Sequence, residues 1–216
     1  MKLPRELGDL PYAAALVSYE GDLAPGGHYD GCLFAGTAFT GARADSGRFA
    51  ECAFADVMLE DLSARGSRLS DVWLSDVRLL SADLAGSSWL DATFAGCAAA
   101  GVQAFDASLR RVVFHECKLD SVNFRGASLV DVTFENCLLR DVDFAGATLK
   151  RTRFPGSALT RADFPRATLE KADLRGAELD ITAGFESLRG AIMTTAQFLI
   201  LAPAVARQLG IEIIDR

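Results

Sequence analysis

Cysteines, histidines and regularly spaced acidic residues are the side chains of this 216-residue chain whose chemistry could serve a function. Metal sites and acid–base catalysis draw on clusters of Cys, His and carboxylates. There are only two histidines, His28 and His115, and the odd number of five cysteines argues against a closed disulfide framework. No nucleotide-binding loop, GxSxG motif or paired metal motif occurs. The sequence therefore predicts no catalytic residue, no metal and no cofactor, and a protein that is not an enzyme.

Acidic residues recur at intervals of twenty in two series that are offset from each other by five residues. If the chain repeats every twenty residues, each series forms a column, and the two columns together form an acidic edge that could bind a partner. Alternatively, Asp at such positions accepts backbone N–H bonds and only shapes a turn. The candidate residues of this acidic edge are Glu51, Asp56, Asp71, Asp76, Asp91, Glu116 and Asp131.

A period of five residues runs through most of the chain. From Phe34 to Leu179, every fifth residue is Phe, Leu, Trp or Ala, over 30 positions without a frame shift. The residue two before each large one is small in 29 of 30 cases, and all five cysteines lie in this small series. Because helices repeat at 3.6 residues and strands at 2, a period of five indicates a chain that turns a corner every five residues.

Glycine supports the same interpretation. Of the 11 glycines between Phe34 and Ile181, ten lie two residues after the large one, which we call the corner position. Glycine there supplies the positive φ that a type II corner favours. Four sides of five residues make a 20-residue coil, in which Cys97, Cys117 and Cys137 share one column. We expect these cysteines to be buried as small hydrophobic residues.

Units such as VDFAGA, RADFPR and KADLRGA resemble the pentapeptide-repeat family, whose unit is A-(D/N)-L-x-x. The resemblance implies an all-β solenoid, a right-handed quadrilateral β-helix. Thirty pentapeptides make about seven and a half coils, and at ~4.8 Å per coil the rod would be roughly 36 Å long. In this family, Asp or Asn just before the large residue, as at Asp83 or Asn123, has a structural role.

Both ends of the chain leave the repeat. Residues 1–29 are expected to form an N-terminal cap, residues 30–181 the β-helix, and residues 182–216 a small α-helical C-terminal cap and dimerisation module. Thr194 or Thr195 can N-cap a helix, and Pro203 is expected to open a second helical segment. Gly210 is a plausible C-cap, and 211–214 should form a short strand.

The C-terminal segment contains an apolar set that either covers the last coil or forms a dimer interface. The pattern SLRGA, Gln197 and LGIEI resembles the C-terminal segment of the gyrase-interacting, MfpA-like pentapeptide proteins, which implies a symmetric homodimer. The candidate interface residues are Ile192, Met193, Phe198, Leu199, Leu201 and Val205, to which Ile200 adds a further apolar side chain.

The weakest stretch of the repeat runs from Ala98 to Phe105. Two successive large positions are filled by Ala99 and Ala104, and a Phe follows one residue late. We therefore expect a distorted side or a bulge in this coil.

The net charge of the chain and its distribution along the sequence indicate which classes of partner it could bind. The net charge of −7 disfavours nonspecific binding to nucleic acid. The charge is −6 between Asp45 and Asp106 and +2 between Lys150 and Asp180. The resemblance to MfpA- and Qnr-like members implies a DNA-mimicking rod that binds DNA gyrase and protects it from quinolones or a toxin. The alternative is a generic interaction scaffold. No membrane segment or signal is apparent, so a cytoplasmic location is expected.

Overall fold

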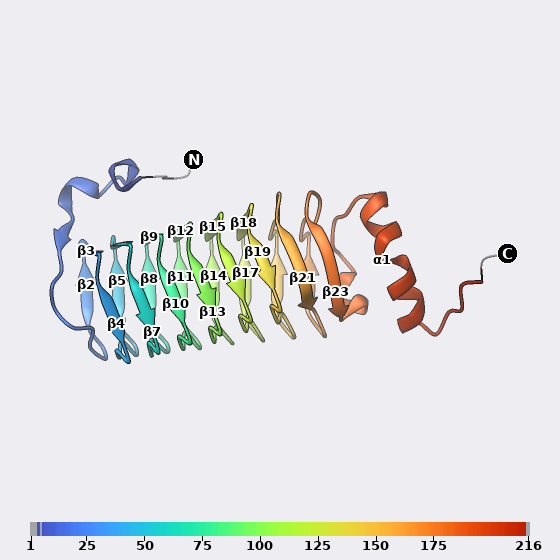
Figure 1. Ribbon diagram of the computed structural model, residues 1–216, viewed down its shortest axis with the longest axis horizontal. Helices are drawn as coiled ribbons and strands as arrows, with labels where there is room; N and C mark the ends of the chain where they lie inside the picture. The colour runs from blue at the N-terminus through green and yellow to red at the C-terminus, as the bar shows by residue number, and fades with distance from the viewer. Residues whose placement is uncertain (1–3, 5, 215–216) are drawn as a thin grey trace.

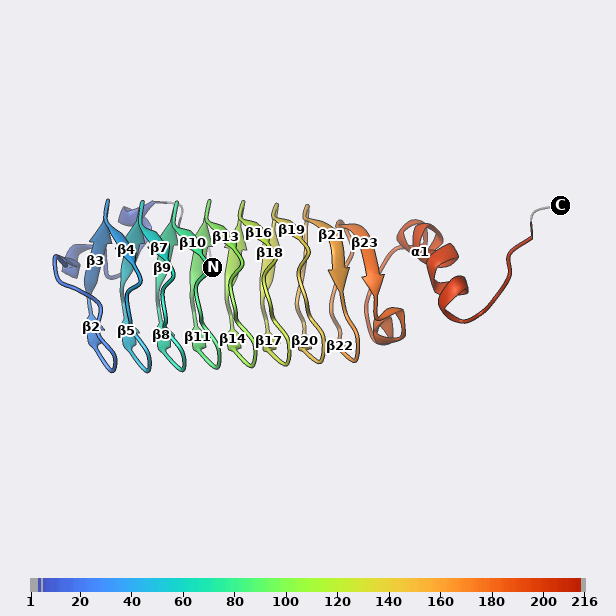
Figure 2. The ribbon, with the colours of Figure 1, turned by 60° about the horizontal axis from the view of Figure 1, so that its bottom comes forward.

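The computed structural model describes residue 4 and residues 6–214, and it is a parallel β-solenoid of about eight coils followed by one C-terminal helix (Figure 1). The coils stack along one axis, and α1 (Thr195–Gln208) lies beyond the last coil at the C-terminal end of the rod (Figure 2). Short strands of mostly three residues form three flat sides, so the solenoid predicted from the period of five is confirmed.

Each sheet runs along the rod, and its neighbouring strands mostly pair residues 20 apart, as between β12 and β15, whereas β1 pairs with β3 at 15 residues. Sheet A contains β1 (Val17–Ser18), β3 (Cys32–Ala35), β6 (Ala53–Ala55), β9 (Trp73–Ser75), β12 (Thr93–Ala95), β15 (Val113–His115) and β18 (Thr133–Glu135). Sheet B contains β2 (His28–Asp30), β5 (Arg48–Ala50), β8 (Arg68–Ser70), β11 (Ser88–Leu90), β14 (Ser108–Arg110), β17 (Ser128–Val130), β20 (Thr148–Lys150) and β22 (Thr168–Glu170).

The third sheet and a fourth, less regular side complete the square. Sheet C contains β4 (Ala38–Thr40), β7 (Met58–Glu60), β10 (Arg78–Leu80), β13 (Ala98–Ala100), β16 (Lys118–Asp120), β19 (Leu138–Arg140), β21 (Ala158–Asp163) and β23 (Glu178–Ala183). On the fourth side, isolated parallel bridges link successive coils, as between Asp83, Gln103 and Asn123.

The corners have one backbone conformation throughout. Every fifth residue from Gly26 to Gly176 has a positive φ, between 48° and 79°. Glycine occupies only 12 of these 31 positions, and most others are Asp, Glu, Arg or Ser. The positive φ expected at the corner glycines is confirmed, and the same strain is accepted by side chains in which this conformation is uncommon.

The interior is filled by columns of stacked side chains. Phe114 and Phe134 stack at 4.8 Å between ring centroids, and Phe134 and Phe154 at 5.1 Å, with rings within 6° of parallel. Phe134 and Phe154 are fully buried. The small series fills the remaining space, and Cys97, Cys117 and Cys137 are buried within it, as expected.

The bulge expected between Ala98 and Phe105 is absent, and that prediction is wrong. Ala99 pairs in register with Leu79 on one side and Leu119 on the other. The ladder of backbone hydrogen bonds keeps the coil regular, so the missing side-chain volume appears as an apolar cavity of about 50 Å³ beside Ala99 and Ala104. The irregular place is near the C-terminal end, where the pairing of β21 with β23 shifts register after Leu159.

A cap closes the C-terminal end. The 3₁₀ helix η3 (Phe185–Leu188) precedes α1 (Thr195–Gln208), whose N-cap Thr194 accepts a hydrogen bond from Gln197 N. The Gln197 amide nitrogen donates to the carbonyl oxygens of Leu174 (2.6 Å) and Ala177 (2.8 Å). Gln197 thereby satisfies acceptors of the last coil that have no following coil to bond.

Two expectations for the C-terminal segment are wrong. Pro203 lies inside α1 instead of opening a second helix. The hydrogen bond that Pro203 cannot donate would go to Leu199, and both residues are exposed, so water can serve that carbonyl. Residues 211–214 form no strand because no neighbouring strand is available to pair with them. Gly210, with φ 70°, follows the C-cap Leu209 and ends the helix.

The N-terminal segment folds back along the rod and does more than close its end (Figure 1). It contains the 3₁₀ helices η1 (Leu7–Asp9) and η2 (Ala13–Ala15), and then β1, which pairs in parallel with β3. Residues 4 and 6–16, here called the N-terminal arm, lie on the outer face of sheet A, where Leu10 packs against Ala53 and Trp73.

Candidate protein-interaction surface

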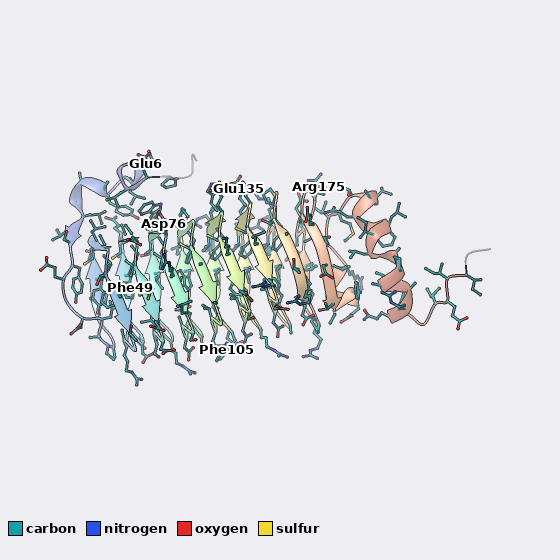
Figure 3. The ribbon with its side chains drawn as sticks, viewed as in Figure 1. Glu6, Phe49, Asp76, Phe105, Glu135 and Arg175 are labelled. Atoms are coloured by element: carbon teal, nitrogen blue, oxygen red, sulfur yellow. The ribbon has the colours of Figure 1, made fainter. Side chains whose placement is uncertain are left out.

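The seven residues of the acidic edge lie on the two corners that border sheet A. All seven are corner residues with φ between 48° and 56°. The column of Glu51, Asp71, Asp91 and Asp131 precedes the strands of sheet A, and the column of Asp56, Asp76 and Glu116 follows them. Asp76 and Glu135 lie toward the upper side of the rod in Figure 3, and Phe105 lies at its lower side.

Arginines neutralise the C-terminal half of the acidic edge. Arg111 makes a two-pronged ion pair with Asp91, at 2.6 and 2.5 Å, and Arg151 does the same with Asp131, at 2.6 Å for both bonds. The hydrogen bond from Arg151 holds the pKa of Asp131 below its ordinary value. These acids are therefore already partnered within the chain.

The N-terminal half keeps its negative charge. Glu51, Asp56, Asp71 and Asp76 are exposed, and none of them forms an ion pair with a described residue. Burial, and then the nearby Asp91 carboxylate, raise the pKa of Asp71. A column of like charges spaced by one coil is electrostatically unfavourable, so an external cation would relieve it.

Glu116 lies in a mixed environment. Both ring nitrogens of His115 face carboxylates, with Nδ1 2.9 Å from Glu135 Oε2 and Nε2 3.3 Å from Glu116 Oε1. His115 lies in β15, and its side chain is only 14% exposed. The imidazole thereby joins a corner and a strand carboxylate of neighbouring coils, Glu116 and Glu135.

Hydrogen bonds to turn N–H groups belong to a different position. The carboxylates of Asp83 and Asp143 accept from the backbone N–H two residues on, at 3.0 and 2.8 Å. Both are at the Asp/Asn position of the repeat, directly before the large residue. Among described residues, no carboxylate of the acidic edge accepts such a bond. The alternative that these acids shape the turn by accepting a backbone N–H bond is therefore not seen at the acidic edge among the described residues. What these residues share with the other corners is their positive φ.

The C-terminal apolar set divides into two groups. Leu201 is buried in the core, and Met193 and Val205 pack against it, so these three cover the last coil. The side chains of Ile192, Phe198 and Leu199 are 39–65% exposed. Ile200 and the apolar residues that follow α1 extend this exposed group: Leu209, Ile211, Ile213 and Ile214.

The described residues contain no group of three or more His, Cys, Asp or Glu arranged to hold a metal ion. Burial raises the pKa of Cys52 to about 12, which leaves little thiolate at neutral pH. None of the described helices has the length and apolar character needed to cross a membrane.

Sequence reasoning missed two features of this surface. It noted the change of charge sign along the edge but not the pairing of each Arg with the Asp one coil before. The spacing of 20 residues between Asp91 and Arg111, and between Asp131 and Arg151, was the available signal. It also missed the N-terminal arm, for which the outward position of Trp73 was the only sign.

Comparison with known proteins agrees with the repeat. Residues 87–164 match the family model described as "Pentapeptide repeat region". No curated protein sequence matches the chain. Among solved structures, trypsin-treated QnrB1, described as a plasmid-mediated fluoroquinolone resistance protein, is 21% identical, with 92% of this chain and 96% of that chain covered and a TM-score of 0.37. HetL, from the cyanobacterium Nostoc sp. strain PCC 7120, is 22% identical, with 78% and 90% covered and a TM-score of 0.25. At these identities the likeness concerns the fold alone.

Proposed function

We propose that this chain, a pentapeptide-repeat protein, is a non-enzymatic protein-binding rod whose N-terminal coils present a DNA-like acidic surface to a type II topoisomerase in the cytoplasm. The observation that carries the proposal is that Glu51, Asp56, Asp71 and Asp76, on two neighbouring edges, are exposed and form no ion pair with a described residue. A surface of a partner protein that normally binds phosphates is basic, and it complements this patch.

The partner class comes from the sequence resemblance to MfpA- and Qnr-like proteins, and the charge sets the extent of mimicry. Duplex DNA carries one charge per ~1.7 Å, or about 21 charges over a rod of roughly 36 Å. The whole chain has a net charge of −7, and Asp91 and Asp131 of the acidic edge are paired with arginine. The mimicry is therefore partial and confined to the N-terminal coils, and shape supplies the rest.

The C-terminal group of Ile192, Phe198 and Leu199 supports a further part of the proposal, a homodimer joined through α1. Exposed apolar side chains of this size are typical of a protein interface. Replacing Phe198 with Asp should give a monomer in size-exclusion chromatography while the β spectrum is retained, because an unpaired charge would be buried in the interface. Ala196→Asp, at an exposed small residue of the same helix, is the matched control.

The gyrase proposal is tested by supercoiling assays with the purified protein, with and without a quinolone. Inhibition of supercoiling, or reduced cleavage by the drug, is expected, and both effects should weaken with added salt because the contact is electrostatic. If gyrase is unaffected under all conditions, the topoisomerase part of the proposal fails. In that case, the generic scaffold, with the basic C-terminal coils around Arg151 and Lys171 open to acidic partners, is the better account.

A further inference from the structure

The outer face of sheet A is apolar in its first three coils. Side chains just before or after each large residue point out of a coil, and elsewhere on the rod they are mostly polar or charged. On this face they are Leu33, Ala35, Ala53, Ala55, Trp73 and Ser75, of which only Ser75 is polar. Ala53 is fully buried and Trp73 is only 4% exposed, because the N-terminal arm lies over them.

Side chains, not a backbone ladder, hold the arm on this face. Leu10, 5% exposed, packs on Ala53 and Trp73, and Leu7 and Tyr12 extend the contact. The backbone hydrogen bonds of η1 and η2 are internal to the arm. Between the arm and the face, the described hydrogen bond is the one that Trp73 Nε1 donates to the Pro4 carbonyl, at 3.4 Å. Such a contact can open without disturbing the coils beneath it.

The face beneath the arm has acidic borders. Glu51 and Asp71 border the face on one side, and Asp56 and Asp76 border it on the other. The described residues of the arm place no base against these carboxylates. Lys2 and Arg5 lie outside the described residues. Burial, and then the Asp71 carboxylate, raise the pKa of Tyr12, which places Tyr12 in the contact beside this border.

We propose that the arm is a displaceable strap, and that the face beneath it binds a segment of a partner protein in which apolar side chains alternate with Lys or Arg. Trp73 and Leu33 would anchor the apolar side chains, since buried aromatic residues dominate such contacts. The two acidic borders would pair with the basic side chains, because none of the four border carboxylates forms an ion pair with a described residue. This site lies between the edges assigned to a topoisomerase above, and it does not depend on that assignment.

The first test compares two full-length variants with the wild type. Leu10→Asp puts a charge into the contact and should release the strap, whereas Ala14→Asp adds the same charge to the same arm at an exposed residue. The probe is a fluorescein-labelled peptide of alternating leucine and lysine, with binding followed by anisotropy. Leu10→Asp should bind at least about tenfold more tightly than the wild type, a gain of about 1.4 kcal/mol. Ala14→Asp should bind like the wild type, and a peptide with glutamate in place of lysine should not bind.

A second test closes the strap. Leu10 and Ala53 belong to one buried cluster, so the double variant Leu10→Cys, Ala53→Cys is oxidised to fix the arm on the face, and formation of the disulfide is checked by mass spectrometry. Oxidation should abolish peptide binding and reduction should restore it, while Trp73→Ser should remove the gain made by Leu10→Asp. Equal binding by oxidised and reduced forms, or by Leu10→Asp and Ala14→Asp, would overturn the proposal. The peptide-binding tests and the gyrase supercoiling assay are separate experiments. Failure of the strap proposal can therefore be distinguished from failure of the gyrase proposal.

Discussion

Asp71 and Asp131 occupy the same column of corners, three coils apart, and they differ in the residue that lies one coil further along the rod. Both have positive φ, at 53° and 56°. Asp71 is followed one coil on by Asp91, and burial and that neighbour raise the pKa of Asp71. Asp131 is followed by Arg151, whose hydrogen bond lowers the pKa of Asp131. In this solenoid, the residue 20 positions further along the chain therefore decides whether a corner carboxylate forms an ion pair or lacks one among the described residues.

The corner positions and the core positions of the solenoid are under different constraints. The same backbone corner accepts Gly, Asp, Arg or Lys at no visible cost to the stacking of coils, so these positions are free to vary in charge. The interior has no such freedom, since every coil must supply matching large and small side chains. The N-terminal and C-terminal halves should therefore be alike inside and unlike at their edges.

The largest expected effect tests the likeness of the two interiors. Phe134→Ala removes a fully buried ring stacked between Phe114 and Phe154, at a cost of about 3–5 kcal/mol. Leu74→Ala, in the same column of the N-terminal half, should cost about 2–5 kcal/mol. Denaturant unfolding measures both. A buried-column variant that kept its unfolding midpoint would show that the column does not hold the coils together.

Filling the central cavity should have a smaller and opposite effect. Ala99→Leu restores a large residue between Leu79 and Leu119 and should stabilise the protein by about 1 kcal/mol, from the cavity of about 50 Å³ that it fills. Ala127→Leu, at a small position with no space beside it, is the control and should destabilise by about 1–3 kcal/mol. Equal effects of the two substitutions would contradict the assigned cavity.

The two corner aspartates should respond to one substitution with opposite signs. Asn tolerates positive φ, so Asp→Asn removes charge and keeps the corner. Asp131→Asn should destabilise by about 0.5 kcal/mol through loss of an exposed ion pair, and Asp71→Asn should stabilise by a similar amount through relief of repulsion. Thermal unfolding at low salt measures the difference, and high salt should shrink it. Effects of the same sign would show that the neighbouring coil does not set the charge environment.

The pH dependence of these two variants gives the finest test. The lowered pKa of Asp131 means that its stabilisation is present above its unfolded pKa of about 3.9 and is lost as pH falls through the folded value. The raised pKa of Asp71 means that its penalty is present at neutral pH and is relieved as pH falls through the folded value toward about 3.9. On acidification, the effect of Asp71→Asn should therefore vanish before that of Asp131→Asn. The reverse order would contradict the assigned causes.

The solenoid could be predicted from the sequence because the period of five is formed by the large and small side chains that must point into the core. Phe134 and Cys137 are where their positions in the repeat place them. The prediction of a bulge near Ala99 was wrong because a small internal cavity costs less than the loss of backbone hydrogen bonds that a break in strand register would cause. Pro203 was misplaced because tertiary packing of α1 overrides a local preference.

The candidate surface was predicted less completely. The acidic columns follow from spacing, but the closing of Arg111 on Asp91 depends on side-chain conformations that spacing does not specify. Leu10 lies outside the repeat and far in sequence from Trp73, so no periodicity points to its docking there, and the outward position of Trp73 was the only sign.

The most direct test of the central claim is the salt dependence of gyrase binding by two double variants. Asp71→Asn with Asp76→Asn removes two unpaired acids, and Asp91→Asn with Asp131→Asn removes two that are paired with Arg111 and Arg151. If the unpaired N-terminal acids contact the enzyme, the first variant should bind more weakly and with a shallower dependence on salt, because fewer charges are matched. The second variant, whose arginines are left free, should not show that loss. Equal losses of affinity and equal salt slopes for the two variants, or no binding by the wild-type protein, would contradict the account.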